Sequence, residues 1–208
     1  IPVVPLRGLV VYPNMNLHFD VGRKKSVAAL NLAMETNQLI FLVSQIDSSV
    51  EDPTEKDVFD VGVICKIKQM IRIPNSSNLR VIVEGIARAS IVTMYYDDNH
   101  YNAVVERAPE FFPQPNAENT AYIRCVKKEY EKYASMFKKI SNEVVAKIIC
   151  CENMDELTDY ICENSFFSFS DKQMLLEEFD PEKRTKSLLT LLRKETASLE
   201  IEAEIHDK

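Results

Sequence analysis

Closely spaced glycines and clustered histidines are both missing from this sequence of 208 residues, and each absence excludes a kind of chemistry. The four glycines lie far apart, at Gly8, Gly22, Gly62 and Gly85. Loops that bind phosphate need glycines in patterns such as GxxxxGKS/T or GxGxxG, so we expect no ATP site. The three histidines form no HExxH motif and adjoin no cysteine, so we expect neither a metal site nor catalysis by this chain.

Cysteine is sparse and follows no pattern. The five cysteines are odd in number and show no CxxC spacing, at Cys65, Cys125, Cys150, Cys151 and Cys162. They indicate neither a secreted disulfide framework nor a zinc site. We predict reduced thiols that are mostly buried, including the adjacent Cys150 and Cys151, whose side chains would point about 100° apart on a helix.

Long apolar runs and an excess of positive charge are also absent. No window approaches the roughly 18 consecutive apolar residues of a membrane span, and Ile1–Pro5 lacks the plan of a signal peptide. We therefore predict a cytoplasmic chain with no membrane partner. The formal net charge of -7 repels polyphosphate, so nucleic acid is not an expected partner.

Glycine and proline are concentrated in the first half of the chain. All four glycines and eight of the nine prolines precede Asn116. Frequent Gly and Pro between short apolar runs are typical of strands joined by turns, whereas a long stretch without glycine is typical of helices. We predict a β-rich subdomain at residues 1–113 and an α-helical subdomain at 114–208.

Apolar and polar residues alternate through much of the β-rich part. This period of two predicts a hairpin over residues 61–84, with its turn at Pro74–Asn78. Further strands are expected at 3–6, 39–43, 86–94 and 102–107, and a helix is expected at 24–36. Such a set predicts a small, partly closed β-barrel, because closure hides the edges of the sheet.

The second half shows helical periodicity and helix-capping residues. Apolar residues recur at steps of three and four from Ile123 to Ile140, which predicts a helix of roughly six turns beginning near Ala117. Further helices are expected to carry Val144–Ile149 and to surround Leu157. Three capping signals are Ser141, a capping box at Ser170 and Gln173, and Asp180 followed by Pro181.

Several segments resemble the amino-terminal domain of the Lon protease family. Two segments are similar to the start of the family's sequence, namely PLRGLVVYP at Pro5–Pro13 and VGRKKS at Val21–Ser26. Phe59–Val63 followed by Val81–Ala89 resembles its central hairpin and the turn after it, and Asp171–Gln173 with the helix from Asp180 resembles its helical part. In this order the similarities cover nearly the whole chain.

The resemblance implies an α+β fold in which a β-rich, PUA-like pseudo-barrel with one helix precedes an α-helical bundle ending in a long helix. It implies a non-catalytic domain that recognises unfolded or degron-bearing proteins and helps to assemble a homo-hexamer. ATP, Mg²⁺ and the catalysis of an ATP-dependent serine protease would belong to AAA+ ATPase and peptidase domains outside this chain. The last helix has no stop signal, so we expect it to continue towards them, with a frayed natural terminus as the alternative.

Four apolar residues in expected loops are the candidates for contact with substrate, namely Met15, Leu17, Phe111 and Phe112. Flexible Met and aromatic side chains suit a surface that accepts many unfolded sequences. Packing in a small satellite core is the alternative for each of them. Arg7 and the four glycines are assigned to the scaffold, with Arg7 pairing with an acid or capping carbonyl groups.

Two other functions remain open. One is a free-standing substrate receptor of the cereblon-like type, although the CxxC pairs of the zinc module that accompanies such receptors are absent. The other is RNA binding, which PUA-like barrels can perform and which the acidic balance disfavours. A Walker motif shortly after Lys208 would favour the protease reading, whereas a stop codon there would remove it.

Overall fold

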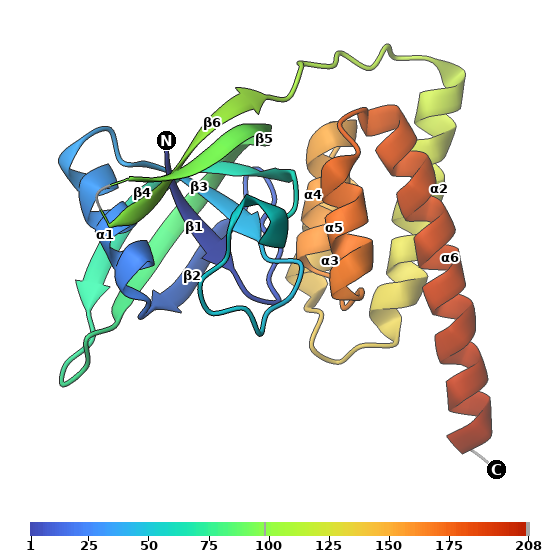
Figure 1. Cartoon of the computed structure of the whole chain (residues 1–208). Coiled ribbons are helices and arrows are strands. Elements are labelled where there is room, and N and C mark those ends of the chain that lie inside the picture. Colours follow the sequence, from blue (N-terminus) through green and yellow to red (C-terminus); the bar gives the residue numbers. More distant parts are fainter. Residues whose placement is uncertain (98, 207–208) are drawn as a thin grey trace. The chain divides into compact units, whose positions relative to one another are not determined.

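A computed structural model describes residues 1–97 and 99–206 of the chain. The chain forms two compact units (Figure 1). The strand unit comprises Ile1–Pro109 and Phe169–Glu177, and the helical unit comprises Glu110–Ser168 and Glu178–Lys208. The predicted boundary between residues 113 and 114 stays a prediction, because the strand unit also includes the later segment Phe169–Glu177.

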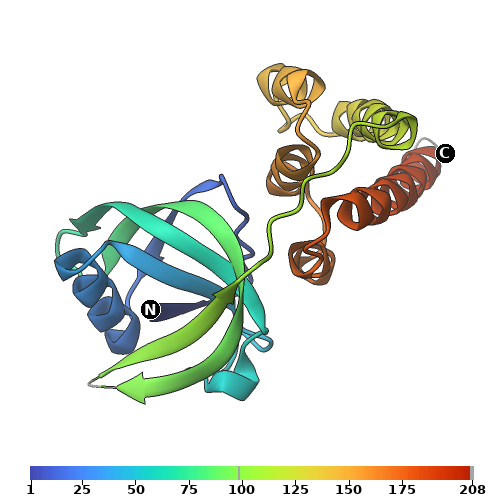
Figure 2. The same ribbon diagram turned by 90° about the horizontal axis from the view of Figure 1, so that it is seen from above.

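The strand unit is built on one six-stranded sheet that closes on itself. Its strands are β1 (Pro2–Leu6), β2 (Asn16–Val21), β3 (Leu39–Ser44), β4 (Val61–Arg72), β5 (Leu79–Asp97) and β6 (His100–Arg107). The order is β2-β5-β4-β3-β1-β6, and β5 pairs a second time with β6. Because β5 is long and its pairing with β4 and β6 shifts register at bulges, it can bend around the ring seen in Figure 2.

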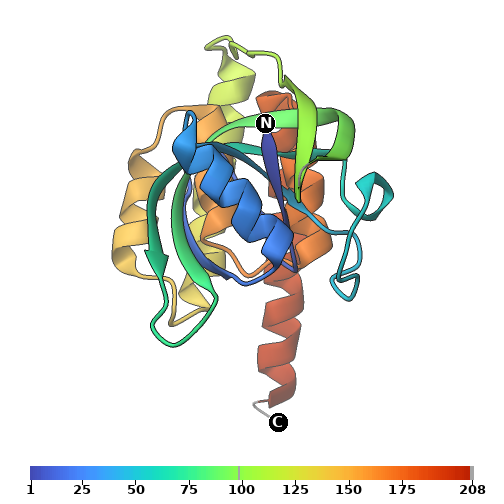
Figure 3. The ribbon, with the colours of Figure 1, turned by 60° about the vertical axis from the view of Figure 1, so that its left-hand side comes forward.

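Helix α1 (Lys24–Glu35) provides the crossover that a parallel strand pair requires. Strands β1 and β3 run parallel, with Val3 opposite Phe41, and α1 packs on both (Figure 3). Val3 and Phe41 also lie in the core of the barrel, together with Val43, Val58, Ala89, Met94, Tyr101 and Ala103. The expected α+β architecture, with a β-rich pseudo-barrel and an α-helical part, is confirmed.

Two expectations about strands are wrong. Residues 16–21 form strand β2, which places Leu17 in a sheet instead of a loop. Residues 79–84 and 86–94 belong to one strand, β5, because Gly85 does not interrupt the pairing. The carbonyl oxygen of Tyr12 lies 2.2 Å from the position that a Cβ atom of residue 85 would take, so this glycine allows a close backbone contact within a continuous strand.

Helix α5 (Phe169–Glu177) packs with the strand unit although it follows much of the helical unit in sequence. The Arg88 guanidinium donates to the Leu176 carbonyl at 3.0 Å, and Tyr12 Oη donates to the Lys172 carbonyl at 2.6 Å. Gln173 Nε2 donates to the Val61 carbonyl at 3.2 Å. The capping-box prediction is wrong. Ser170 lies within α5 instead of before it, and Gln173 Oε1 has no hydrogen-bond partner among the described residues.

The helical unit contains α2 (Ala117–Ser135), α3 (Asn142–Cys150), α4 (Met154–Glu163) and α6 (Pro181–His206). Ser141 caps α3 by accepting from Val144 N at 3.3 Å, as predicted. Asp180 Oδ1 accepts from Glu182 N at 2.9 Å and Pro181 is the first residue of α6, which confirms that start signal. Helix α2 ends at Ser135, about one turn before the apolar periodicity does.

Arg184 is completely buried in the helical unit and is held by several groups. Its Nε donates to Thr158 Oγ1 at 2.9 Å and lies 3.8 Å from Asp159, while Nη2 contacts Asp155. Its Nη1 donates to the Glu178 carbonyl at 2.7 Å. This network joins α4 to α6, and a charge so deeply buried is tolerated only because it is paired and hydrogen-bonded.

Candidate functional site

Met15 and Leu17, two of the candidate contact residues, are both half-buried in the strand unit. The Met15 carbonyl accepts from Gly85 N at 2.9 Å, and Leu17 lies opposite Val83 in the pairing of β2 with β5. Backbone pairing therefore fixes both residues in place. Their contact with substrate stays a prediction.

Phe111 and Phe112 lie in the helical unit, in the segment that precedes α2. Phe112 is 77% exposed and Phe111 is 43% exposed. Two adjacent aromatic side chains at the surface can take part in recognition without disturbing a core. Met15 and Leu17 thus belong to the strand unit, and Phe111 and Phe112 belong to the helical unit.

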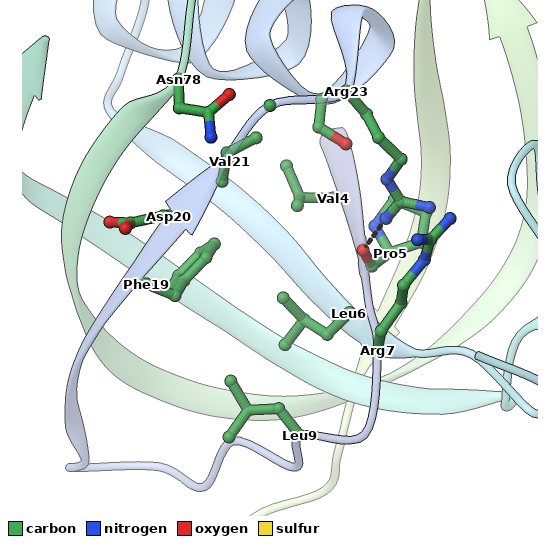
Figure 4. Close-up of a pocket in the computed structure, with 12 residues that line it drawn as sticks. Val4, Pro5, Leu6, Arg7, Leu9, Phe19, Asp20, Val21, Arg23 and Asn78 are labelled. Carbon is green, nitrogen blue, oxygen red and sulfur yellow. Dashed lines mark hydrogen bonds between the residues drawn. The ribbon is translucent and has the colours of Figure 1, made fainter. Parts of the chain in front are cut away.

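A pocket of about 470 Å³ lies in the strand unit between β1, β2 and the start of α1. Figure 4 shows apolar side chains around it, and those from the two strands are Val4, Pro5, Leu6, Phe19 and Val21. Sequence reasoning missed this pocket. The alternation of Leu17, Phe19 and Val21 with polar residues could have revealed β2, and with it one wall of the pocket.

Arg7 and Arg23 also line the pocket, and Figure 4 shows both side chains beside Pro5. Arg23 donates through Nη1 to Gln45 Oε1 at 2.6 Å and through Nη2 to the Pro5 carbonyl. Arg7 donates through Nη2 to the Val50 carbonyl at 3.2 Å, so its expected role as a carbonyl cap is confirmed. Burial and then the charge of Arg7 lower the pKa of the Arg23 guanidinium.

A second pocket of about 500 Å³ adjoins the first and shares Arg7, Arg23 and Ser26 with it. One cationic and one acidic side chain of this pocket already form an ion pair, because Lys25 Nζ lies 2.5 Å from Asp52 Oδ1. Tyr101 Oη donates to the same carboxylate at 2.8 Å. The hydrogen bonds from Lys25 and then from Tyr101 hold the pKa of Asp52 below its usual range.

The cysteines do not form a site. Cys65 and Cys162 are buried, Cys151 is intermediate, and Cys125 and Cys150 are exposed, so the prediction of mostly buried thiols is wrong. The reason is that α3 packs through Ile148, which turns its neighbouring C-terminal residues towards solvent.

Across residues 1–97 and 99–206, no cluster of three or more His, Cys, Asp or Glu side chains is arranged to hold a metal ion. None of the helices in these ranges combines the length and apolar content needed to cross a bilayer.

Two solved structures with similar folds are amino-terminal domains. The N-terminal domain of Mycobacterium avium complex Lon protease superposes with a TM-score of 0.73 at 21% identity, covering 95% of this chain and 97% of that one. The Lon N-terminal domain protein from Xanthomonas campestris gives a TM-score of 0.65 at 15% identity, over 91% of this chain and 96% of that one. Both similarities support the fold.

Sequence relatives agree with this fold. Lon protease of Clostridioides difficile (strain 630) is 37% identical over 99% of this chain, and Lon protease 1 of Bacillus subtilis (strain 168) is 38% identical over 99%. The chain spans 26% of the length of each. The family model for the ATP-dependent protease La (LON) substrate-binding domain matches residues 1–194. Since that model and these relatives cover nearly all of the sequence, the chain belongs to the family of LON substrate-binding domains.

Proposed function

We propose that this chain captures unfolded or degron-bearing polypeptides for a Lon-type ATP-dependent protease and contributes to the assembly of its homo-hexamer. The observation that carries the proposal is the match of the LON substrate-binding domain model to residues 1–194. In this proposal the ATPase and serine peptidase domains, with ATP and Mg²⁺, lie outside the chain, and the protein works in the cytoplasm. The chain itself carries no catalysis.

The exposed pair Phe111 and Phe112 supports a role in capture. Aromatic groups at the surface can bind many unfolded sequences, because such contacts need apolar area and no exact hydrogen-bond pattern. We extend the proposal to Met15 and Leu17, whose half-buried side chains offer a second apolar contact. A hexamer would present six copies to one polypeptide, so each single contact can be weak.

The test is a titration of a labelled, permanently unfolded protein with the purified chain. We expect weak binding, with a Kd on the order of tens of micromolar, since a single domain lacks the gain from multivalency. A Phe111→Ser/Phe112→Ser variant should bind several-fold more weakly. The matched control is Ile149→Ser/Ile201→Ser, which removes two apolar side chains of the same unit that are 41% and 58% exposed.

Circular dichroism first establishes that both variants fold. If the Phe variant binds as well as wild type, Phe111 and Phe112 are not the contact surface. If both variants lose the same affinity, any exposed apolar side chain suffices and the pair is not special. If wild type itself shows no binding at high concentration, the capture role fails and assembly is the remaining role.

A further inference from the structure

We propose that the pocket between β1 and β2 binds the free carboxyl end of an extended polypeptide. The last residue of this polypeptide is apolar, and its side chain packs among Val4, Leu6 and Phe19. The terminal carboxylate of the polypeptide binds the guanidinium groups of Arg7 and Arg23. This inference rests on the proposed role in polypeptide capture and specifies one end of the polypeptide as the part recognised.

The first argument is positive charge without a matching carboxylate. Arg7 and Arg23 donate to carbonyl and amide oxygens, and among the described residues neither arginine forms an ion pair. Two acids near them are engaged elsewhere, because Arg80 binds Asp20 at 2.8 and 3.0 Å and Lys25 binds Asp52. A third, Glu51, lines the adjoining pocket and accepts from Arg23 through its backbone carbonyl. Two neighbouring unpaired guanidinium groups in a chain of net charge -7 indicate an anionic ligand.

The second argument is the start of helix α1, which adjoins the arginines. This helix of 12 residues has no side-chain cap and no acidic residue in its first turn. Its free N–H groups and the positive end of its dipole therefore remain available to an anion. Ser26 in that turn is 2% exposed and lines both pockets.

The third argument concerns the rest of the ligand. Within the described part of the chain, β2 pairs with β5 alone, so its other edge offers unpaired N–H and C=O groups to an extended backbone. A simple phosphate ion would use the arginines but leave the apolar walls and the strand edge without a role. The carboxyl end of a polypeptide with an apolar last residue uses all three, and a pocket of about 470 Å³ lies in the size range of ligand sites.

The test measures fluorescence anisotropy of a labelled Ser- and Gln-rich peptide that ends in leucine. One form carries a free carboxylate and the other an amide. We expect the purified chain to bind the free acid about tenfold more tightly, because charge-assisted hydrogen bonds are lost with the amide. Arg7→Gln should abolish this preference, Arg7→Lys should keep part of it, and the exposed control Arg107→Gln should keep it in full.

Three results would overturn the inference. Equal affinity of wild type for acid and amide would exclude a carboxylate site. Equal affinity for peptides ending in leucine and in glycine would exclude the apolar contact, and inorganic phosphate would then be the better ligand. A preference that survives Arg7→Gln in a correctly folded variant would place the carboxylate elsewhere. The unfolded-protein titration is run on the same sample, so that binding there without a preference here refutes this site alone.

Discussion

Arg184, Arg80 and Arg7 occupy three different electrostatic environments. Arg184 has no exposed surface and contacts two carboxylates, and Arg80 makes a two-pronged ion pair with Asp20 at the surface. Arg7 meets only a carbonyl among the described residues. A buried pair stabilises a fold mainly by leaving no charge uncompensated, whereas an exposed pair contributes little. The arginine without an acidic partner is the one best suited to bind a ligand.

Thiol reactivity should follow the burial of the cysteines. Burial raises the pKa of the Cys65 thiol far above its usual range, so almost none of it is thiolate at pH 8. Burial also raises the pKa of the half-buried Cys151, whereas Cys125 and Cys150 are exposed. We expect Cys125 and Cys150 to react first with Ellman's reagent, followed by Cys151.

Cys65 and Cys162 should react slower by on the order of a hundredfold or more, because they need local opening of the structure. Mass spectrometry of the labelled peptides identifies each thiol, and urea-unfolded protein provides the control in which all five react. Early modification of Cys65 in the folded chain would contradict this order.

At the scale of elements, Gly85 holds strand β5 against the turn at Tyr12–Met15. A Cβ atom at residue 85 would lie 2.2 Å from the Tyr12 carbonyl oxygen, and backbone hydrogen bonds connect Gly85 to both Asn14 and Met15. Gly85→Ala must therefore displace the turn. We expect a loss of about 1–3 kcal/mol in the free energy of unfolding, as for other overpacked sites, measured by urea denaturation.

Gly22→Ala is the matched control. A Cβ atom there would meet Asn78 Oδ1 at 2.4 Å, but this atom ends a flexible side chain that can rotate away. Its cost should stay within about 0.5 kcal/mol, the range of ordinary surface substitutions. A Gly85→Ala variant as stable as Gly22→Ala would show that the turn is loosely attached to β5.

Most elements could be predicted from the sequence because each has a local signal. The alternation around Val63 and Val81 predicted the hairpin, and Ser141 and Asp180 marked two helix starts. Strand β2 was missed because its alternation is short and follows a proline turn. The pocket was missed because its walls come from β1, β2 and α1, and only tertiary structure brings these together.

At the scale of the whole molecule, the chain passes three times between its two units. It leaves the strand unit after Pro109, returns to it as α5, and then enters the helical unit again through α6. Three side chains of the strand unit, Tyr12, Arg88 and Gln173, make the hydrogen bonds that attach α5 to its own unit. The sequence could not show this, because the periodicity of α5 identifies a helix and not the surface it covers.

The backbone amides of helix α5 should therefore lose protection from hydrogen exchange together with those of the strands, and not with those of the helices that flank α5 in sequence. Arg184→Ala removes the buried guanidinium that hydrogen-bonds to α4 and to the segment before α6, and should destabilise the helical unit by about 3–5 kcal/mol. Hydrogen exchange followed by mass spectrometry should then show faster exchange in α4 and α6, with α5 close to its wild-type rate. Gly85→Ala should give the reverse pattern, and the exposed control Arg193→Ala should change neither. Equal acceleration of α4, α5 and α6 by Arg184→Ala would mean that α5 unfolds with the helical unit despite its contacts.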